Sequence, residues 1–132
     1  MKKWGLLVLC LLSLSTVCAQ HKYKVYSRLI AREMFADIHI RELYIDYGQP
    51  DIEKNKQNNY LVDEEGNKID FRTMSAAMNY MSKIGWELEQ IYVRSVPDDI
   101  TYVVWVLSKE VSSDSEITQG FQTRLMYEKS KK

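Results

Sequence analysis

The sequence has few of the residue types that most often carry catalysis, metal binding or cross-links. Its 132 residues include only two cysteines, two histidines, two prolines and five glycines. It contains no HExxH motif, no Cys/His metal-ligand spacing, no Gly-rich phosphate loop and no Gly-x-Ser-x-Gly elbow. We therefore expect no metal and no cofactor, and we identify no catalytic residue.

Both cysteines lie in an N-terminal segment that is typical of a secretory signal peptide. Lys2 and Lys3 precede an apolar run from Trp4 to Leu14, and Val17-Cys18-Ala19 supplies a cleavage site. We predict a signal peptide over residues 1–19, cleaved after Ala19, and a periplasmic or secreted protein. The run is too short for a membrane span. A lipoprotein signal is less favoured, because it needs a small residue before the cysteine. The mature chain would contain no cysteine, which excludes disulfides and thiol catalysis together.

The charge balance gives no sign of a nucleic-acid or anionic-membrane partner. The chain has 18 basic and 18 acidic residues, and removing the signal peptide takes away two lysines, which leaves a slightly acidic protein. The basic cluster Lys129, Lys131 and Lys132 is best explained as a solvated terminus. The remaining length is enough for one domain, which we place at residues 20–110, followed by a tail over 111–132.

A helix followed at once by a strand is the clearest local pattern. Methionines and other apolar residues recur at helical spacing, and Thr73, or Asp70 in its place, can cap the N-terminus. Gly85 can close the helix with a positive φ, which lets Trp86 fold back on the last turn. The apolar face is expected to lie in the core rather than to form a binding surface. Its members are Met74, Ala77, Met78, Met81 and Ile84.

Two strands are predicted before this helix. Tyr23, Val25 and Leu29 alternate with polar residues, and a second strand carries Ile38 and Ile40 on one parity but Leu43, Ile45 and Tyr47 on the other. A β-bulge near Arg41 and Glu42 would bring both sets to one face. The connection is expected over 31–37. Residues 51–59 are expected to form an exposed, mobile loop, and residues 60–69 a small hairpin.

Two strands and a tail helix are predicted after the helix. Apolar residues change parity between Leu88 and Ile91, so the first of these strands switches face. A turn at 96–99 leads into the nearly unbroken apolar run 100–107, which is typical of an inner strand. Ser113 and Glu116 have capping-box spacing, with Ile117, Phe121 and Leu125 following at every fourth residue. The fold class is therefore α+β: an antiparallel sheet of about four strands in the order β-β-α-β-β, with a helix on one face and a C-terminal helix.

Several short segments together resemble a small bacterial family, the domain of unknown function 4177. Its signature is a helix that ends in Gly-Trp-Glu-Leu, as residues 85–88 do here. Secreted members from Bacteroides-type bacteria are similar in further stretches. The segments that carry the likeness are Tyr23-Lys24-Val25, Tyr47-Gly48-Gln49, residues 61–66, residues 78–88 and Ser108-Lys109-Glu110. The resemblance implies a fold and no activity, since the family has no assigned function. The signal peptide, the 51–59 loop and the tail depart from shorter members.

Tyrosines are the strongest functional lead. The chain has nine, and several on one exposed sheet face could form a stacking platform for sugars or peptides. Half-buried packing is the commoner role for tyrosines in a small sheet. The candidate ligand-binding residues are Tyr26, Tyr44, Tyr60, Tyr92 and Tyr102.

The other polar candidates have simpler explanations. His21 lies near the predicted mature terminus, and His39 has the parity opposite to Ile38 and Ile40, so neither indicates a site. The acidic residues at 63–65 lack calcium-ligand spacing and are typical of a turn.

Our first hypothesis is an exported, non-enzymatic binding or interaction module of the bacterial cell envelope, with a protein or glycan partner. One alternative is a small hydrolase or lyase that uses Asp, Glu and Tyr. The other is a structural protein that self-associates into a homo-oligomer through an edge strand.

Overall fold

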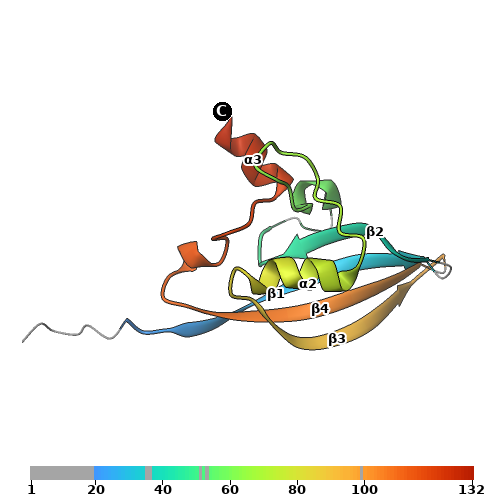
Figure 1. Ribbon diagram of the computed structural model, residues 1–132, viewed down its shortest axis with the longest axis horizontal. Helices are drawn as coiled ribbons and strands as arrows, with labels where there is room; N and C mark the ends of the chain where they lie inside the picture. The colour runs from blue at the N-terminus through green and yellow to red at the C-terminus, as the bar shows by residue number, and fades with distance from the viewer. Residues whose placement is uncertain (1–19, 35–36, 51, 53, 99) are drawn as a thin grey trace, which may run out of the picture.

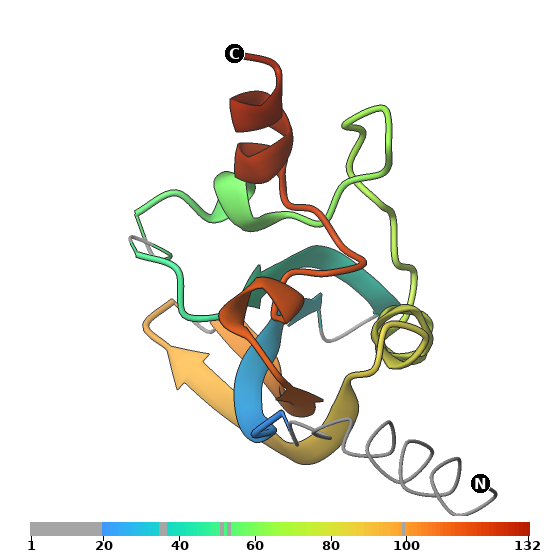
Figure 2. The same cartoon turned by 90° about the vertical axis from the view of Figure 1, so that its left-hand side faces the viewer.

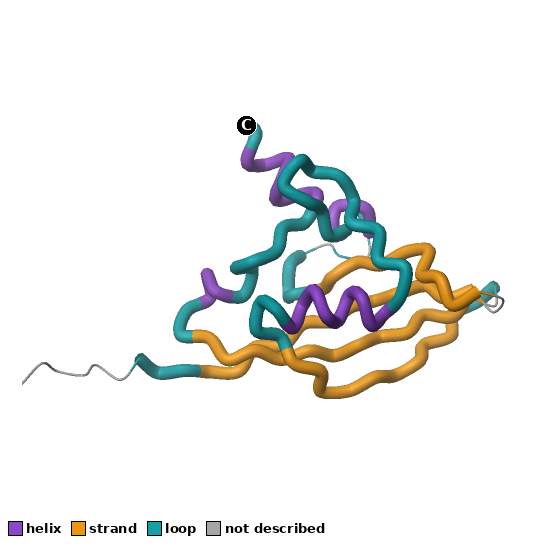
Figure 3. Tube along the Cα trace, viewed as in Figure 1, coloured by secondary structure: helices purple, strands orange, loops and turns teal. Residues whose placement is uncertain are grey.

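The computed structural model describes residues 20–34, 37–50, 52, 54–98 and 100–132. An antiparallel four-stranded sheet and two α-helices make up an α+β fold, as the sequence predicts (Figures 1 and 3). The elements are β1 (Tyr23–Met34), β2 (Asp37–Asp46), the 3-10 turn η1 (Lys56–Asn59), α2 (Met74–Ser82), β3 (Glu87–Val96), β4 (Ile100–Val111), the 3-10 turn η2 (Asp114–Glu116) and α3 (Arg124–Ser130). None of the helices among these residues is long and apolar enough to cross a membrane.

The strands lie in the order β2-β1-β4-β3. β1 and β2 form one hairpin, β3 and β4 form the other, and the two hairpins are joined where β1 pairs with β4. β1 and β4 pair along their whole length, from Tyr23 opposite Val111 to Glu33 opposite Thr101. The apolar run in β4 is therefore an inner strand, as predicted. β2 and β3 form the two edges.

The first hairpin is longer than the sequence suggested. The predicted connection over 31–37 is wrong, because β1 continues to Met34 and pairs with Asp37 at the start of β2. The register shifts between Glu42 and Asp37 on the β2 side, where a bulge was predicted. Ile40 consequently packs against the same core as Leu43 and Ile45. The irregularity thus brings Ile40 to the face of Leu43 and Ile45, and the Ile38 side chain lies outside the described part of the structure.

Helix α2 forms for the local reasons that its sequence indicates. Thr73, not Asp70, is the N-cap, and its hydroxyl accepts a bond from the Ala76 N–H at 3.2 Å. Gly85 has a φ of 94°, and the Trp86 N–H then bonds the Met81 carbonyl at 3.2 Å. The Trp86 side chain is 1% exposed and Met81 is 0% exposed. Burial of these side chains fixes the helix on the sheet. Figure 2 shows α2 nearly end-on, beside the strands.

The parity change in β3 comes from a bulge, and the predicted switch of face is wrong. The register with β4 shifts between Leu88 and Gln90, so Leu88 lies on the same face as Ile91 and Val93. All three side chains are exposed. Helix α2 therefore leaves the apolar side chains of β3 accessible to solvent.

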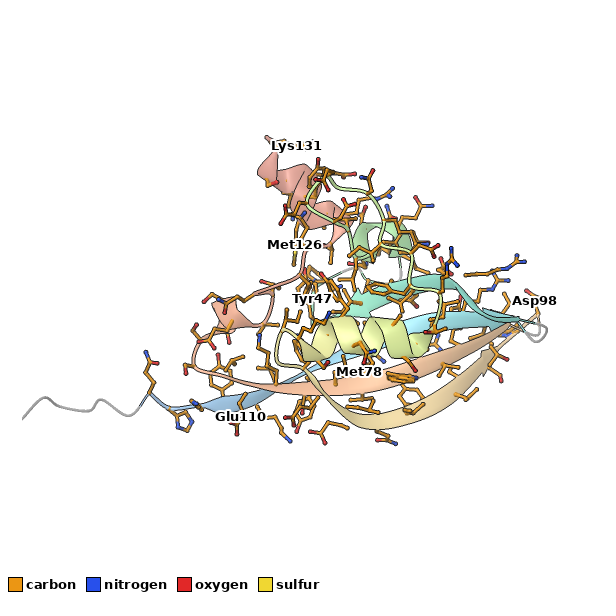
Figure 4. The ribbon with its side chains drawn as sticks, in the orientation of Figure 1. Tyr47, Met78, Asp98, Glu110, Met126 and Lys131 are labelled. Atoms are coloured by element: carbon orange, nitrogen blue, oxygen red, sulfur yellow. The ribbon has the colours of Figure 1, made fainter. Side chains whose placement is uncertain are left out.

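The segments after β2 and β4 pack together beside the β2 edge. The predicted hairpin at 60–69 is present, with Val62 bridged to Lys68, and Leu61 is bridged to Thr123 from the tail. Tyr47, labelled in Figure 4, and Phe121 stack edge to face, with ring centroids 5.7 Å apart. The tail therefore contributes to the core.

The C-terminal helix begins later than predicted. Ser113 makes no capping bond, and only a 3-10 turn forms at 114–116. Gly120, with a φ of 95°, then breaks the helical path. α3 starts at Arg124 instead and is capped by Thr123, whose hydroxyl accepts from the Met126 N–H. The four-residue spacing of Ile117 and Phe121 reflects core contacts made without a continuous helix.

Candidate functional site

Four of the five candidate tyrosines lie on one face of the sheet. Residues directly opposite each other in antiparallel strands share a face, and Ile30 of β1 lies opposite both Tyr44 and Val104. Val104 in turn lies opposite Tyr92, and the same parity places Tyr26 and Tyr102 on this side. We call this surface, which is opposite to α2, the tyrosine face.

These tyrosines differ strongly in burial. Tyr44 and Tyr102 are 7% and 8% exposed and pack with Ile30 and Val104 in a second apolar cluster. Tyr92 and Tyr60 are half-buried against that cluster, and Tyr26 is 59% exposed. The ring faces of Tyr44 and Tyr102 are thus engaged in packing, so the sheet does not present a flat stacking platform of five rings.

A pocket of about 190 Å³ opens on the tyrosine face. Ile30 and Val104, from the two central strands, are its apolar members. Two tyrosines and three cationic side chains complete the lining, and it includes no carboxylate from the described part of the chain. These residues are Tyr44, Tyr102, Arg28, Lys56 and Arg94.

The segment after β2 supplies Lys56. The sequence predicted an exposed, mobile loop over 51–59, and this is wrong for the end of the segment, where η1 forms and Asn59 is 4% exposed. The Asn59 side chain accepts from Gln49 Nε2 at 2.8 Å and donates to the Asn55 carbonyl at 3.3 Å. Ile52 packs against the tyrosine-face cluster. Asp51 and Glu53 lie outside the described residues. The buried amide therefore holds Lys56 over the sheet.

Arg28 and Asp46 form an ion pair at the margin of the pocket. Arg28 Nε donates to Asp46 Oδ2 at 2.8 Å, and Nη2 donates to the same oxygen. A third nitrogen, Nη1, lies 3.4 Å from the Tyr92 hydroxyl. The bond with Asp46 raises the pKa of the Arg28 guanidinium. Asp46 thus orients the guanidinium across the face of the sheet.

Lys56 is held by aromatic partners. Its Nζ donates to the Tyr102 hydroxyl at 2.8 Å and lies 4.7 Å from the Tyr102 ring centroid and 5.7 Å from that of Tyr44. The bond to Tyr102 raises the pKa of Lys56, and burial raises the pKa of Tyr44. Lys56 is therefore cationic and Tyr44 neutral at neutral pH. The Tyr102 hydroxyl therefore orients a charged ammonium over the sheet.

Tyr60 lies at the β2 end of the face and is fixed by polar contacts. Its hydroxyl donates to Glu42 Oε1 at 2.9 Å, and Lys68 Nζ lies 4.3 Å from its ring centroid. Burial, followed by the bond to Glu42, raises the pKa of Tyr60 to about 12. Tyr60 is not part of the pocket lining.

The remaining polar candidates do not converge. His21 is exposed, and the His39 side chain lies outside the described part of the structure. Asp63 accepts bonds from the Glu65 and Asn67 N–H groups at 3.1 and 2.8 Å, as expected of a turn. Among the residues that the structure describes, no three His, Cys, Asp or Glu side chains are grouped so as to hold a metal ion.

The sequence pointed to the tyrosines but missed the cations. Arg28 has the parity of Tyr26, and Arg94 has that of Tyr92, so alternation alone could have placed both on the tyrosine face. Lys56 gave no such signal, because its position depends on the turn that Asn59 stabilises.

Comparisons with protein-family models, with curated proteins and with solved structures find no match, so the resemblance to the domain of unknown function 4177 stays a prediction.

Proposed function

We propose that this protein is an exported, non-enzymatic binding module that takes a small carboxylate in the pocket on the tyrosine face. The observation that carries this proposal is the composition of the lining, in which three cations surround two buried apolar residues and none of the described residues is an acid. A carboxylate can be supplied by an acidic sugar or by the C-terminus of a peptide. The two sources share this chemistry and are separated by experiment.

The cations suit an anionic group in both charge and geometry. Arg28, oriented by Asp46, and Arg94 contribute positive charge to the lining, and guanidinium groups suit carboxylates in charge and planar geometry. Lys56 adds a point charge from above the sheet, already oriented by Tyr102 at 2.8 Å. A hydrogen bond to a charged group contributes about 1.5–3 kcal/mol. Two or three such bonds in one pocket would give selective binding of a small ligand.

The size of the pocket limits the ligand to a small group. A volume of about 190 Å³ corresponds to roughly six water molecules at about 30 Å³ each. One sugar ring or one terminal amino acid is of this scale. Ile30 and Val104 would contact the carbon skeleton while the cations hold the carboxylate.

Binding accounts for this site better than catalysis does. Hydrolysis by carboxylates needs two acids facing each other across a cleft. Asp46, at the margin of the pocket, is the acid that could serve as one member of such a pair. Its Oδ2 already accepts two hydrogen bonds from Arg28. An acid occupied in this way orients its partner.

The test is calorimetric titration of the purified protein with sodium glucuronate, with N-acetylalanine and with the neutral sugar glucose. We expect binding of at least one of the two carboxylates and none of glucose. Lys56→Gln should weaken that binding about tenfold, which corresponds to about 1.4 kcal/mol.

Lys131→Gln is the matched control, because it removes the same charge at the end of α3 (Figure 4) and Lys131 does not line the pocket. It should leave affinity unchanged. Equal losses for both variants, or no heat with either carboxylate, would contradict the proposal. Preference for glucuronate indicates a glycan ligand, and preference for N-acetylalanine indicates a peptide end.

Export rests on the signal peptide that residues 1–19 predict. Expression in a Gram-negative host and intact-mass measurement of the periplasmic fraction tests it. We expect a chain that begins at Gln20. Recovery from the cytoplasm with residues 1–19 retained would contradict export and leave the pocket proposal untouched.

A further inference from the structure

The outer edge of β3 is open, whereas the β2 edge is not. The Ile40 N–H of β2 bonds the Arg72 carbonyl at 3.3 Å, and the Ile45 carbonyl accepts from Gln49 Nε2 at 2.8 Å. Within the described ranges, no backbone group of Glu87–Val96 bonds to a segment other than β4. Figure 1 likewise shows no described element beyond β3. Unpaired N–H and C=O groups on an edge strand are a template for another strand.

The same strand carries most of the exposed apolar surface. Four large hydrophobic side chains in the described part of the chain are exposed, and three of them belong to β3. Leu88, Ile91 and Val93 are 43%, 47% and 63% exposed and lie on the face that α2 occupies. An open edge and an adjoining apolar stripe therefore coincide.

We propose that the occupant of this edge is a second copy of the chain, paired through β3 in antiparallel orientation about a two-fold axis at Tyr92. Every second residue of a strand directs its backbone N–H and C=O toward the same edge. When β3 pairs with a second β3 in antiparallel orientation, opposite residues must both be of that kind or both be of the other, so their numbers have an even sum. The register centred on Tyr92 places Ile91 of each copy opposite Val93 of the other. Both apolar residues then gain an apolar cross-strand partner.

The charges of β3 favour pairing with itself. Its first half carries Glu87 and Glu89, and its second half carries Arg94. Antiparallel pairing directs Arg94 of each copy toward the acidic half of the other, with Gln90 as its direct cross-strand partner. Parallel pairing would instead bring like charges together. The strand is thus self-complementary in one orientation only.

The dimer would join the two tyrosine faces into one surface. The axis at Tyr92 sets the two Tyr92 side chains beside each other. Arg94, which lines the pocket, would lie next to the partner copy's Gln90. Each pocket would gain a neighbouring group from the other copy. The dimer does not depend on which ligand the pocket takes.

Mass measurement tests the association. Light scattering over a concentration series, on protein expressed from the full-length gene, should give twice the mass of one chain. Val93→Lys, at a position already 63% exposed, should give the mass of one chain with an unchanged circular dichroism spectrum. Tyr26→Lys is the matched control, since Tyr26 is 59% exposed on β1, and it should stay dimeric. A monomer throughout, or a dimer that survives Val93→Lys, would overturn the proposal.

Cross-linking tests the register in a Cys10→Ser, Cys18→Ser background. Tyr92→Cys should form a disulfide-linked dimer under mild oxidation, because opposite Cα atoms lie about 4.5–5.5 Å apart, within disulfide range. Ser95→Cys should cross-link far more slowly, because that position lies six residues, or roughly 20 Å, from its copy. Equal rates, or faster cross-linking at position 95, would refute this register. Loss of carboxylate binding with the dimer intact would contradict only the pocket proposal.

Discussion

Replacing Met81 with alanine is expected to destabilise the protein far more than the same change at Met78. Both methionines lie within α2, Met78 at its centre and Met81 in its last turn, so the change in helix propensity is similar for the two. Met81 is 0% exposed in the core, whereas Met78 is only partly buried at its margin. The comparison therefore isolates packing between the helix and the sheet.

The magnitudes follow from burial. Replacing a fully buried methionine with alanine costs about 2–5 kcal/mol of stability, because the transfer free energy of the removed atoms is lost and a cavity is left behind. At Met78 water can fill the space, so only part of the transfer energy is lost, about 1 kcal/mol. A domain of this size is stable by about 5–15 kcal/mol. Met81→Ala would thus remove a large share of it.

Urea unfolding followed by tryptophan fluorescence measures the difference. With a slope of about 1–3 kcal/mol/M, Met81→Ala should lower the midpoint by about 1 M or more. Met78→Ala should lower it by a fraction of that, with the same slope. Equal shifts for the two variants would refute the assignment of Met81 to the core. A larger shift for Met78→Ala would mean that the face of α2 carrying Met78, not the one carrying Met81, packs against the sheet.

Three further predictions concern capping and titration. Thr73→Ala should lower the free energy of unfolding by about 1 kcal/mol in the same assay, through loss of the N-cap; no change would show that the cap is dispensable. The hydrogen bond from Lys24 lowers the pKa of Glu89 below its ordinary 4.5, so its contribution is present above that pH and is lost as the pH falls. Urea midpoints of Glu89→Gln should therefore fall less on acidification than those of the wild type, and parallel curves would contradict this. Burial raises the pKa of Tyr60 from 10.0 to about 12, so its contribution is present below pH 10 and is lost as the pH rises toward 12. Tyr60→Phe should flatten the alkaline loss of stability and remove the last phenol to titrate at 295 nm; a steeper loss would refute the assignment.

Local signals in the sequence were sufficient for much of the fold. Thr73, Gly85 and Trp86 each act within a few residues, so capping and positive φ could be inferred from chemical type alone. The parity change between Leu88 and Ile91 was visible in the sequence, but its cause, a bulge rather than a switch of face, was not. The strand order was not predictable, because it depends on the pairing of β1 with β4 across about eighty residues.

The site was harder to predict than the fold. Alternation predicts which tyrosines share a face, but it does not reveal that Tyr44 and Tyr102 are packed beneath Lys56. That arrangement depends on Asn59, whose side-chain bonds reach Gln49 and Asn55. The prediction of a tail helix starting near Ser113 failed for a related reason. Phe121 lies in the core, while Gly120, with its positive φ, prevents a continuous helix. Tertiary contacts overrode the local pattern in both places.

The most direct test of the pocket is chemical-shift mapping by ¹H–¹⁵N NMR during titration with glucuronate or N-acetylalanine. The account predicts that the largest shifts fall on amides of the tyrosine face around the pocket, at Ile30, Lys56 and Val104, and that Lys56→Gln suppresses them. Shifts confined to α2 and its apolar face, or none at any concentration of either carboxylate, would contradict it.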